Sequence, residues 1–299
     1  MCAALDRLLT FDPGERGVDK LDAAGDGGSR VVAAATTLRD AVADGECVIL
    51  TTGFPIPPAG RPETDGPPGT MVLARALRAM GAAPVIVAEP TLSEPLAAAA
   101  DVLGCPAVPF EPITPAATSA AAKRVLTRCE PTAVIAIERP SRTADGSYRS
   151  MTGTEITDHV APVDALFTAA QARGIPTIGV GDGGNEIGMG RVRSTVEAEI
   201  DHGDRIAATT AVDQLVVAGV SNWGAYGIVA ALATRTESAA LHDPATERAL
   251  LAACCEAGCV DGRAGVAAPR VDGLDAELHA HLVGLLNGVV DHTTTKETS

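Results

Sequence analysis

The chain has 299 residues, of which 46% are hydrophobic and only 2% are aromatic, and it carries a formal net charge of −15. This length suffices for a buried core made of Ala, Val, Ile and Leu. The negative charge repels phosphate backbones and anionic membranes, and aromatic side chains that could stack on bases are scarce. We therefore expect neither a nucleic acid nor a membrane as a partner.

The seven cysteines are odd in number and show no paired CxxC spacing, which argues against a disulfide framework and a zinc ribbon. The first residues have neither a basic start nor an apolar stretch of the kind found in secretory leaders, and no long uncharged apolar run follows.

We expect reduced thiols and a cytoplasmic location. The sequence leaves the oligomeric state open, a homo-oligomer included.

Apolar runs rich in Val and Ile alternate with helix-like segments along the chain. The predicted strands are residues 47–52, 84–88, 132–137, 175–180 and 214–218. The predicted helices are residues 29–43, 70–80, 93–103, 115–128, 162–173, 222–234, 244–257 and 274–290. This alternation is typical of the α/β fold class, a mainly parallel sheet with helices on both faces. We predict one such domain over residues 1–292 and a polar tail over residues 293–299.

Each predicted strand is followed by a polar or glycine-rich segment. The C-terminal ends of parallel strands meet at one edge of a sheet, where ligands bind in the crevice. We therefore expect one active site at the C-terminal strand ends. The polar residues at these exits are Glu63, Asp65, Glu138, Arg139, Asp182, Asn185, Glu186 and Asn222.

One glycine-rich segment combines more backbone freedom with polar side chains than any other part of the sequence. It covers residues 178–190 and reads Ile-Gly-Val-Gly-Asp-Gly-Gly-Asn-Glu-Ile-Gly-Met-Gly. Part of this segment matches the GxGxxG dinucleotide pattern, but Asp182 and Glu186 stand where a pyrophosphate requires bare N–H groups. The pattern therefore does not favour NAD or FAD.

The side chains of Asp182, Asn185 and Glu186 allow two kinds of chemistry. Two carboxylates in a partly desolvated loop can separate their pKa values and serve as base and acid without any cofactor. The same three side chains offer the hard oxygen ligands that Mg²⁺ prefers. Both uses remain open at this point.

Five motifs in the same order resemble the D-glutamate cyclase family. They are Thr52-Gly-Phe-Pro, Glu63-Thr-Asp-Gly-Pro-Pro-Gly, Glu138-Arg-Pro with Asp145-Gly-Ser-Tyr-Arg-Ser-Met-Thr-Gly, the glycine-rich segment, and Val220-Ser-Asn-Trp-Gly. The similarity extends from Asp12-Pro-Gly-Glu-Arg-Gly to Val260-Asp-Gly. It implies a lyase that converts D-glutamate to 5-oxo-D-proline and water. Ser141 and Thr152 depart from the pattern, since Gly and Arg are expected there.

Lactam formation assigns roles to the exit residues. The α-amine must lose a proton and attack the γ-carboxyl carbon, and the expelled hydroxyl must gain a proton. We predict Asp182 and Glu186 as the base and acid, with Asn185 beside them and Glu138 as an alternative partner. The N–H groups of Gly183 and Gly184 are expected to bind the oxyanion.

Further residues are predicted to bind the small acidic amino-acid substrate. Arg139 and Arg142 are candidates for clamping a carboxylate, although Arg142 also fits an exposed loop charge. The helix that opens at Thr70 offers free N–H groups to an anion, and Asn222 opens another helix, where Asn also fits as an N-cap. Glu63 and Asp65 complete the predicted binding set.

The leading hypothesis is thus a cyclase that acts on a small acidic amino acid without a cofactor. The first alternative is an Mg²⁺-dependent hydrolase or phosphatase that uses Asp182, Asn185 and Glu186 as ligands. The second alternative is a non-catalytic binder of small acidic metabolites in which the same loops bind without turnover.

Overall fold

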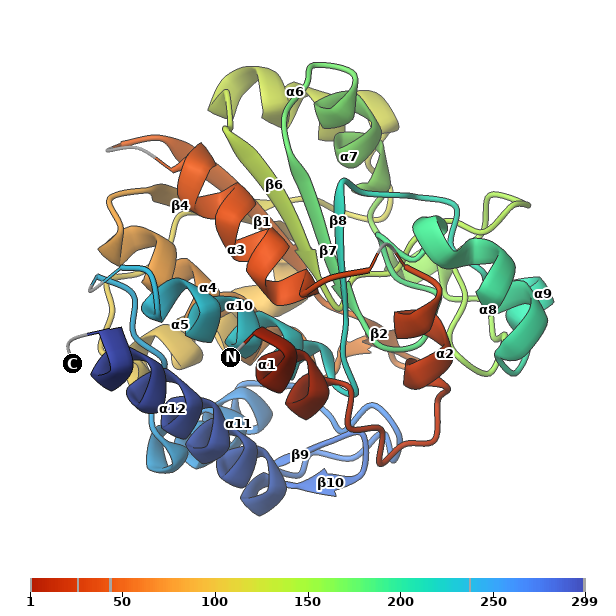
Figure 1. The fold of residues 1–299 in the computed structure, drawn as a ribbon. Helices are drawn as coiled ribbons and strands as arrows, with labels where there is room; N and C mark the ends of the chain where they lie inside the picture. Colours follow the sequence, from red (N-terminus) through yellow and green to blue (C-terminus); the bar gives the residue numbers. More distant parts are fainter. Residues whose placement is uncertain (1, 26, 43–44, 237, 298–299) are drawn as a thin grey trace.

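A parallel β-sheet with helices on both faces forms the centre of the molecule (Figure 1). The computed structural model describes residues 2–25, 27–42, 45–236 and 238–297. Its six-stranded sheet has the order β5-β4-β1-β6-β7-β8, and every neighbouring pair is parallel. The predicted α/β fold class is confirmed.

All five predicted strands belong to this sheet. They are β1 (Cys47–Thr52), β4 (Ala83–Ala88), β6 (Ala133–Ile137), β7 (Thr177–Gly181) and β8 (Gln214–Val217). The sixth strand, β5 (Phe110–Pro112), was not predicted because it is short and ends in proline, which only an edge strand tolerates well. Two small hairpins lie outside the sheet, β2 (Pro55–Ile56) with β3 (Arg61–Pro62) and β9 (Arg270–Val271) with β10 (Leu274–Asp275).

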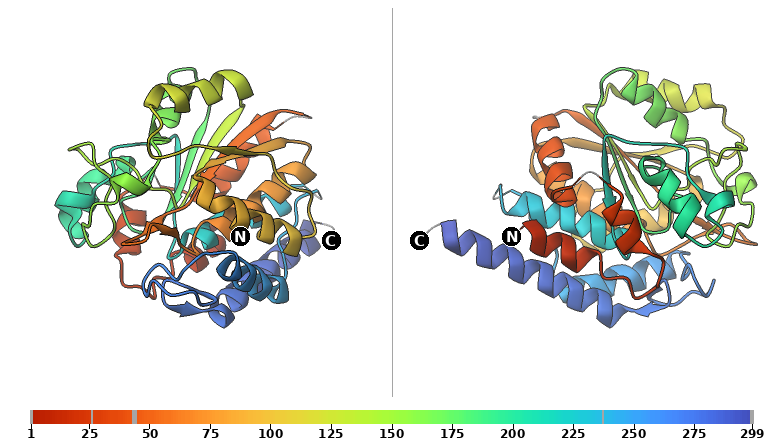
Figure 2. Two further views of the ribbon diagram at one scale, coloured as in Figure 1. Left: turned by 180° about the vertical axis from the view of Figure 1, so that it is seen from behind. Right: turned by 45° about the vertical axis from the view of Figure 1, so that its right-hand side comes forward.

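Helices fill two hydrophobic layers, one on each face of the sheet. Successive side chains of a strand point to opposite faces, so Val48 and Leu50 join one cluster while Ile49 joins the other. The first layer contains α1 (Cys2–Leu9), α3 (Arg30–Ala41), α4 (Pro67–Ala79), α5 (Ser93–Val102), α10 (Ser221–Ala233), α11 (Pro244–Glu256) and α12 (Ala276–Glu297). The second contains α2 (Val18–Ala23), α6 (Ser119–Cys129), α7 (Asp164–Gln171), α8 (Arg193–Glu199) and α9 (Gly203–Ile206). Figure 2 shows α12 lying outside α1 and α10.

The predicted helices are all present, with shifted ends. The segment 29–43 ends earlier, as α3, and Ala43 itself lies outside the described residues. Helix α12 includes residues 293–297 of the predicted polar tail, and residues 298–299 lie outside the described part. Helices α1, α2, α8 and α9 were missed because each is short. No helix within the described ranges has the length and apolar character needed to cross a membrane.

The strand order places a crevice beside β1. From β1 the chain first builds outward through β4 and β5, then returns to build β6, β7 and β8 on the other side. The loops after β1 and β6 consequently diverge, although a hydrogen bond from Gly53 N–H to the Glu138 carbonyl still ties them together. Such a reversal of strand order is the place where open α/β sheets bind ligands.

Arg139 is a structural cation below this crevice, which corrects its predicted role in binding substrate. Its side chain is fully buried, and its Nη2 donates to Glu89 Oε1 at 2.7 Å. The guanidinium also donates to the carbonyl oxygens of Thr52, Gly53 and Ala161. It therefore joins the exits of β1, β4 and β6 and has no face open to a ligand.

Arg139→Met should lower the free energy of unfolding by about 3–5 kcal/mol, because it leaves the Glu89 carboxylate buried without its cation. Denaturant unfolding measures this loss. The matched control is Arg248→Met, which breaks an exposed pair with Glu277 and should change stability little. Equal stabilities for the two variants would contradict the structural role of Arg139.

Candidate active site

A cavity of about 440 Å³ opens at the C-terminal ends of the strands. It lies next to the crevice formed by the loops after β1 and β6, and residues from distant parts of the sequence line it. They are Gly14, Arg16, Phe54, Ile56, Pro57, Glu63, Glu138, Ser150, Met151, Thr152, Asp182, Asn185, Gly262, Arg263, Ala264, Gly265 and Asp272.

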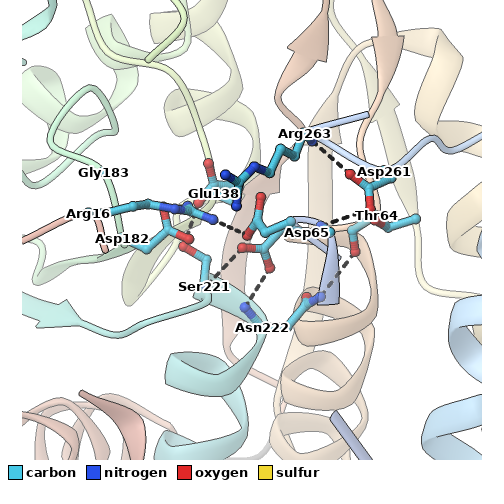
Figure 3. A network of polar contacts seen from close by, with 12 residues as sticks. Arg16, Thr64, Asp65, Glu138, Asp182, Gly183, Ser221, Asn222, Asp261 and Arg263 are labelled. Atoms are coloured by element: carbon cyan, nitrogen blue, oxygen red, sulfur yellow. Dashed lines mark hydrogen bonds and ion pairs between the residues drawn. The ribbon is translucent and has the colours of Figure 1, made fainter. Parts of the chain in front are cut away.

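Three buried carboxylates lie close together, and two of them, Glu138 and Asp182, line this cavity. Asp65, Glu138 and Asp182 each place one carboxylate oxygen within 4.8 Å of the other two (Figure 3). Asp65 precedes α4, whereas Glu138 and Asp182 directly follow β6 and β7. The approach is close because Gly66 has no side chain, and a Cβ there would lie 2.9 Å from Glu138 Cβ. The structure thus brings together three of the predicted site residues, and Glu63 lines the same cavity.

Arg16 is a cation that faces this cluster, and it was not predicted because it does not follow a strand. Its Nη1 lies 2.6 Å from Asp182 Oδ1, and its Nη2 lies 2.5 Å from Asp272 Oδ2. The carboxylate of Asp12 accepts the backbone N–H groups of Arg16, Gly17 and Val18, which fixes the loop that carries the arginine. This loop follows α1 rather than a strand, so its only signal was the Asp12-Pro-Gly-Glu-Arg-Gly motif.

Glu138 occupies a strained and buried position. Its φ of 45° lies in the left-handed region, which costs a residue other than glycine about 1–3 kcal/mol. Ser221 Oγ donates a hydrogen bond to Glu138 Oε2 at 2.5 Å. Ser221 was not predicted, although it stands beside Asn222 in the last motif.

The burial of like charges raises several pKa values at the site. Burial first, and then the carboxylates of Asp182 and Glu186, raise the pKa of Glu138 well above its usual range. Burial also raises the pKa of Asp182, while Arg16 opposes this rise. The pKa of Glu63 is raised by burial and by Asp272. The cluster therefore retains protons at a pH where exposed carboxyl groups have lost them.

Glu186 stabilises the glycine-rich loop, which corrects two predictions. Its Oε1 accepts the N–H groups of Asp182 at 3.0 Å and Gly183 at 2.7 Å, and its Oε2 accepts Gly184 N–H at 2.7 Å. The N–H groups of Gly183 and Gly184 are therefore not free to bind an oxyanion. Glu186 is buried behind the loop and does not line the cavity, so the geometry does not support its predicted role as acid or base.

Side chains at the N-terminus of α4 accept hydrogen bonds from the N-terminus of α10, and the reverse is also true. The N–H groups that donate these bonds are therefore not free to bind a substrate anion. Asp65 accepts the N–H groups of Ser221 and Asn222, and Asn222 Oδ1 accepts those of Gly66 and Gly69. Thr70 N–H donates to the Gly66 carbonyl, and Pro67 and Pro68 have no N–H group. The predicted anion site at Thr70 is therefore wrong, and Asn222 holds the helices in place rather than contacting the cavity.

The remaining predicted residues are divided between the cavity and the surrounding loops. Arg142 Nε contacts Asp164 Oδ2 at 2.9 Å and Tyr148, away from the cavity, so its predicted contact with substrate is not supported. Asn185 lines the cavity with its Oδ1 buried and without a hydrogen-bond partner in the described residues, while its Nδ2 donates to the Arg149 carbonyl.

The two departures from the family motifs have different surroundings. Ser141 Oγ accepts the Thr210 N–H at 3.2 Å, outside the cavity. Thr152 lines the cavity, and its hydroxyl contacts those of Ser150 and Thr154. The side chain at position 152 therefore bears directly on what the cavity can hold.

The acidic residues that could hold a metal ion differ from the predicted set. Glu186 uses both carboxylate oxygens on backbone N–H groups, so the predicted set of Asp182, Asn185 and Glu186 lacks a free carboxylate at Glu186. Asp65, Glu138 and Asp182 do converge. Asp65, however, already accepts three backbone N–H groups, and Asp182 is paired with Arg16.

The raised pKa of Asp65 should make the stability of the protein depend on pH. Burial, and then the charge of Asp272, raise its pKa to about 7, against about 3.9 in an unfolded chain. The folded protein therefore keeps a proton that the unfolded chain has released. The stabilising contribution of this group is complete below about pH 4 and is lost as the pH rises through about 7.

Asp65→Asn removes this titration. The unfolding free energy of the wild type minus that of Asp65→Asn should decrease between about pH 4 and about pH 8, as measured by urea unfolding. A difference that stays constant or grows over this range would show that Asp65 has no raised pKa.

Comparison with known proteins agrees with the family resemblance of the sequence motifs. A sequence model of the family described as D-glutamate cyclase-like, C-terminal, matches residues 5–287. Human mitochondrial D-glutamate cyclase is 35% identical over 244 residues, which are 76% of this chain and 38% of that relative. The chain thus spans well under half the length of the human protein. It belongs to the D-glutamate cyclase-like family.

Proposed function

We propose that this chain converts D-glutamate to 5-oxo-D-proline and water at the cluster of Asp65, Glu138 and Asp182. The observation that carries the proposal is the convergence of these three buried carboxylates, two of which line the cavity, so that protons and negative charge can be held side by side. Membership of the family and the name of the human relative support the same reaction.

Asp182 is the proposed base. Arg16 lies 2.6 Å from its Oδ1 and favours the ionised form, while Oδ2 is buried without a hydrogen-bond partner in the described residues. The α-ammonium of the substrate is a donor of the kind that such an acceptor lacks. Proton transfer to Asp182 leaves a neutral amine, which attacks the γ-carboxyl carbon.

Glu138 is the proposed acid. Burial is the largest cause of its raised pKa, and the neighbouring charges that raise the pKa further are all carboxylates. Glu138 therefore retains its proton more readily than Asp182, whose pKa is lowered by the Arg16 cation beside it. As the new C–N bond forms, the nitrogen gives its second proton to the γ-carboxylate oxygen that will depart, which becomes a hydroxyl. As the C–O bond breaks, Glu138 gives its proton to this hydroxyl, which leaves as water, and the proton held by Asp182 then restores Glu138. Ser221 Oγ holds the carboxyl group in position.

Asp182→Asn and Glu138→Gln should each lower kcat by about 100-fold or more, because each removes one proton-transfer group. The measurement is the formation of 5-oxo-D-proline from D-glutamate by chiral chromatography. The matched control is Glu277→Gln, an exposed carboxyl on α12. Folded wild type that forms no product, or wild-type rates in both site variants, would contradict the proposal.

An Mg²⁺-dependent hydrolase or phosphatase is the second candidate, and the converging oxygens of Asp65, Glu138 and Asp182 favour it. Metal analysis of the purified protein and the effect of EDTA on activity distinguish it from the proposed cyclase. A non-catalytic binder would instead be stabilised by D-glutamate against thermal unfolding while forming no product.

A further inference from the structure

Arg263 is a cation at the cavity whose charge has no partner in the part of the chain that the structure describes. It lines the cavity but is exposed, and only its backbone N–H makes a hydrogen bond. Figure 3 shows its side chain extending toward Glu138 and Asp65. Arg16 differs, because two of its guanidinium nitrogens are already paired with Asp182 and Asp272.

The loop that carries Arg263 is fixed by a buried carboxylate. Asp261 is fully buried, and its Oδ1 accepts the N–H groups of Arg263 at 2.8 Å and Ala264 at 2.9 Å. Its Oδ2 accepts the Gly273 N–H at 2.8 Å, which ties this loop to the hairpin of β9 and β10. The backbone at position 263 is thus held at the cavity while the long side chain stays free to meet a ligand.

The geometry of the reaction decides which substrate group lies near Arg263. The amine and the γ-carboxyl carbon must approach within about 3–3.5 Å of each other, so both lie at the carboxylate cluster. The α-carboxylate takes no part in the bond changes and remains outside the new ring. The carboxylates of the cluster repel it, so it is directed toward the exposed cation.

We propose that Arg263 binds the α-carboxylate of the substrate and thereby selects amino acids that carry this group free. The inference rests on the proposed function. A guanidinium matches a carboxylate with two parallel N–H donors, which fixes orientation as well as charge. Arg263 is exposed before the ligand arrives, so the free enzyme does not bury an unpaired charge.

The test compares D-glutamate with its α-amide, which keeps the amine and the γ-carboxyl group but lacks the α-carboxylate. Arg263→Ala should raise KM for D-glutamate by about 10-fold to 100-fold, the usual effect of losing a charged hydrogen-bond pair. KM for the α-amide should change by less than about threefold, and kcat for D-glutamate should change less than KM. The KM of Arg263→Lys for D-glutamate should lie between the KM values of the wild type and of Arg263→Ala.

Arg248→Ala is the matched control, because it removes an arginine that is exposed on α11 away from the cavity. Circular dichroism and thermal unfolding establish that each variant is folded. If Arg263→Ala raised KM equally for both substrates, or did not raise KM for D-glutamate, the proposed role of Arg263 would be overturned. The cyclase proposal would remain intact. Wild type that cyclises neither compound would overturn both.

Discussion

The repulsion between buried carboxylates that converge beside one cavity is the constraint on which the site depends. Coulomb interactions are strong where water is excluded, so Asp65, Glu138 and Asp182 cannot all be ionised without compensation. Two kinds of compensation are present. Arg16 neutralises part of the charge at Asp182, and proton retention lowers the charge at Glu138. In the proposed reaction Asp182 is the base and Glu138 the acid, because Arg16 forms an ion pair with Asp182, whereas Glu138 forms no ion pair in the described part of the chain.

The backbone N–H groups around the cavity stabilise the protein's own carboxylates. Glu186 accepts three of them in the glycine-rich loop, and Asp65 accepts those at the start of α10. These hydrogen bonds keep charged and flexible segments ordered at the edge of the sheet. The N–H groups of Gly183, Gly184, Ser221 and Asn222 are therefore already paired within the protein.

The strands of the sheet could be predicted from the sequence because a strand that is buried on both faces consists of a short run of apolar residues. β1, β4, β6, β7 and β8 all lie within such runs. It also placed Asp65, Glu138 and Asp182 at one edge, since parallel topology brings strand exits together. It could not separate Arg139, buried against Glu89, from Arg16, which reaches the cavity from a loop after α1. Both are arginines in short motifs, and only the tertiary packing distinguishes a structural ion pair from a group at the site.

The uneven distribution of charge around the cavity has a consequence for how a dicarboxylic amino acid is oriented. Buried acceptor oxygens at Asp182 and Asn185 lack donors within the described residues, whereas Arg263 presents a cation at the exposed side. An ammonium group is attracted to the first region and a carboxylate to the second. Since both groups are attached to one carbon of the substrate, this arrangement sets the direction of the remaining chain. In the proposed cyclisation the γ-carboxyl group then approaches the amine by folding back toward Glu138, the proposed proton donor to the departing hydroxyl.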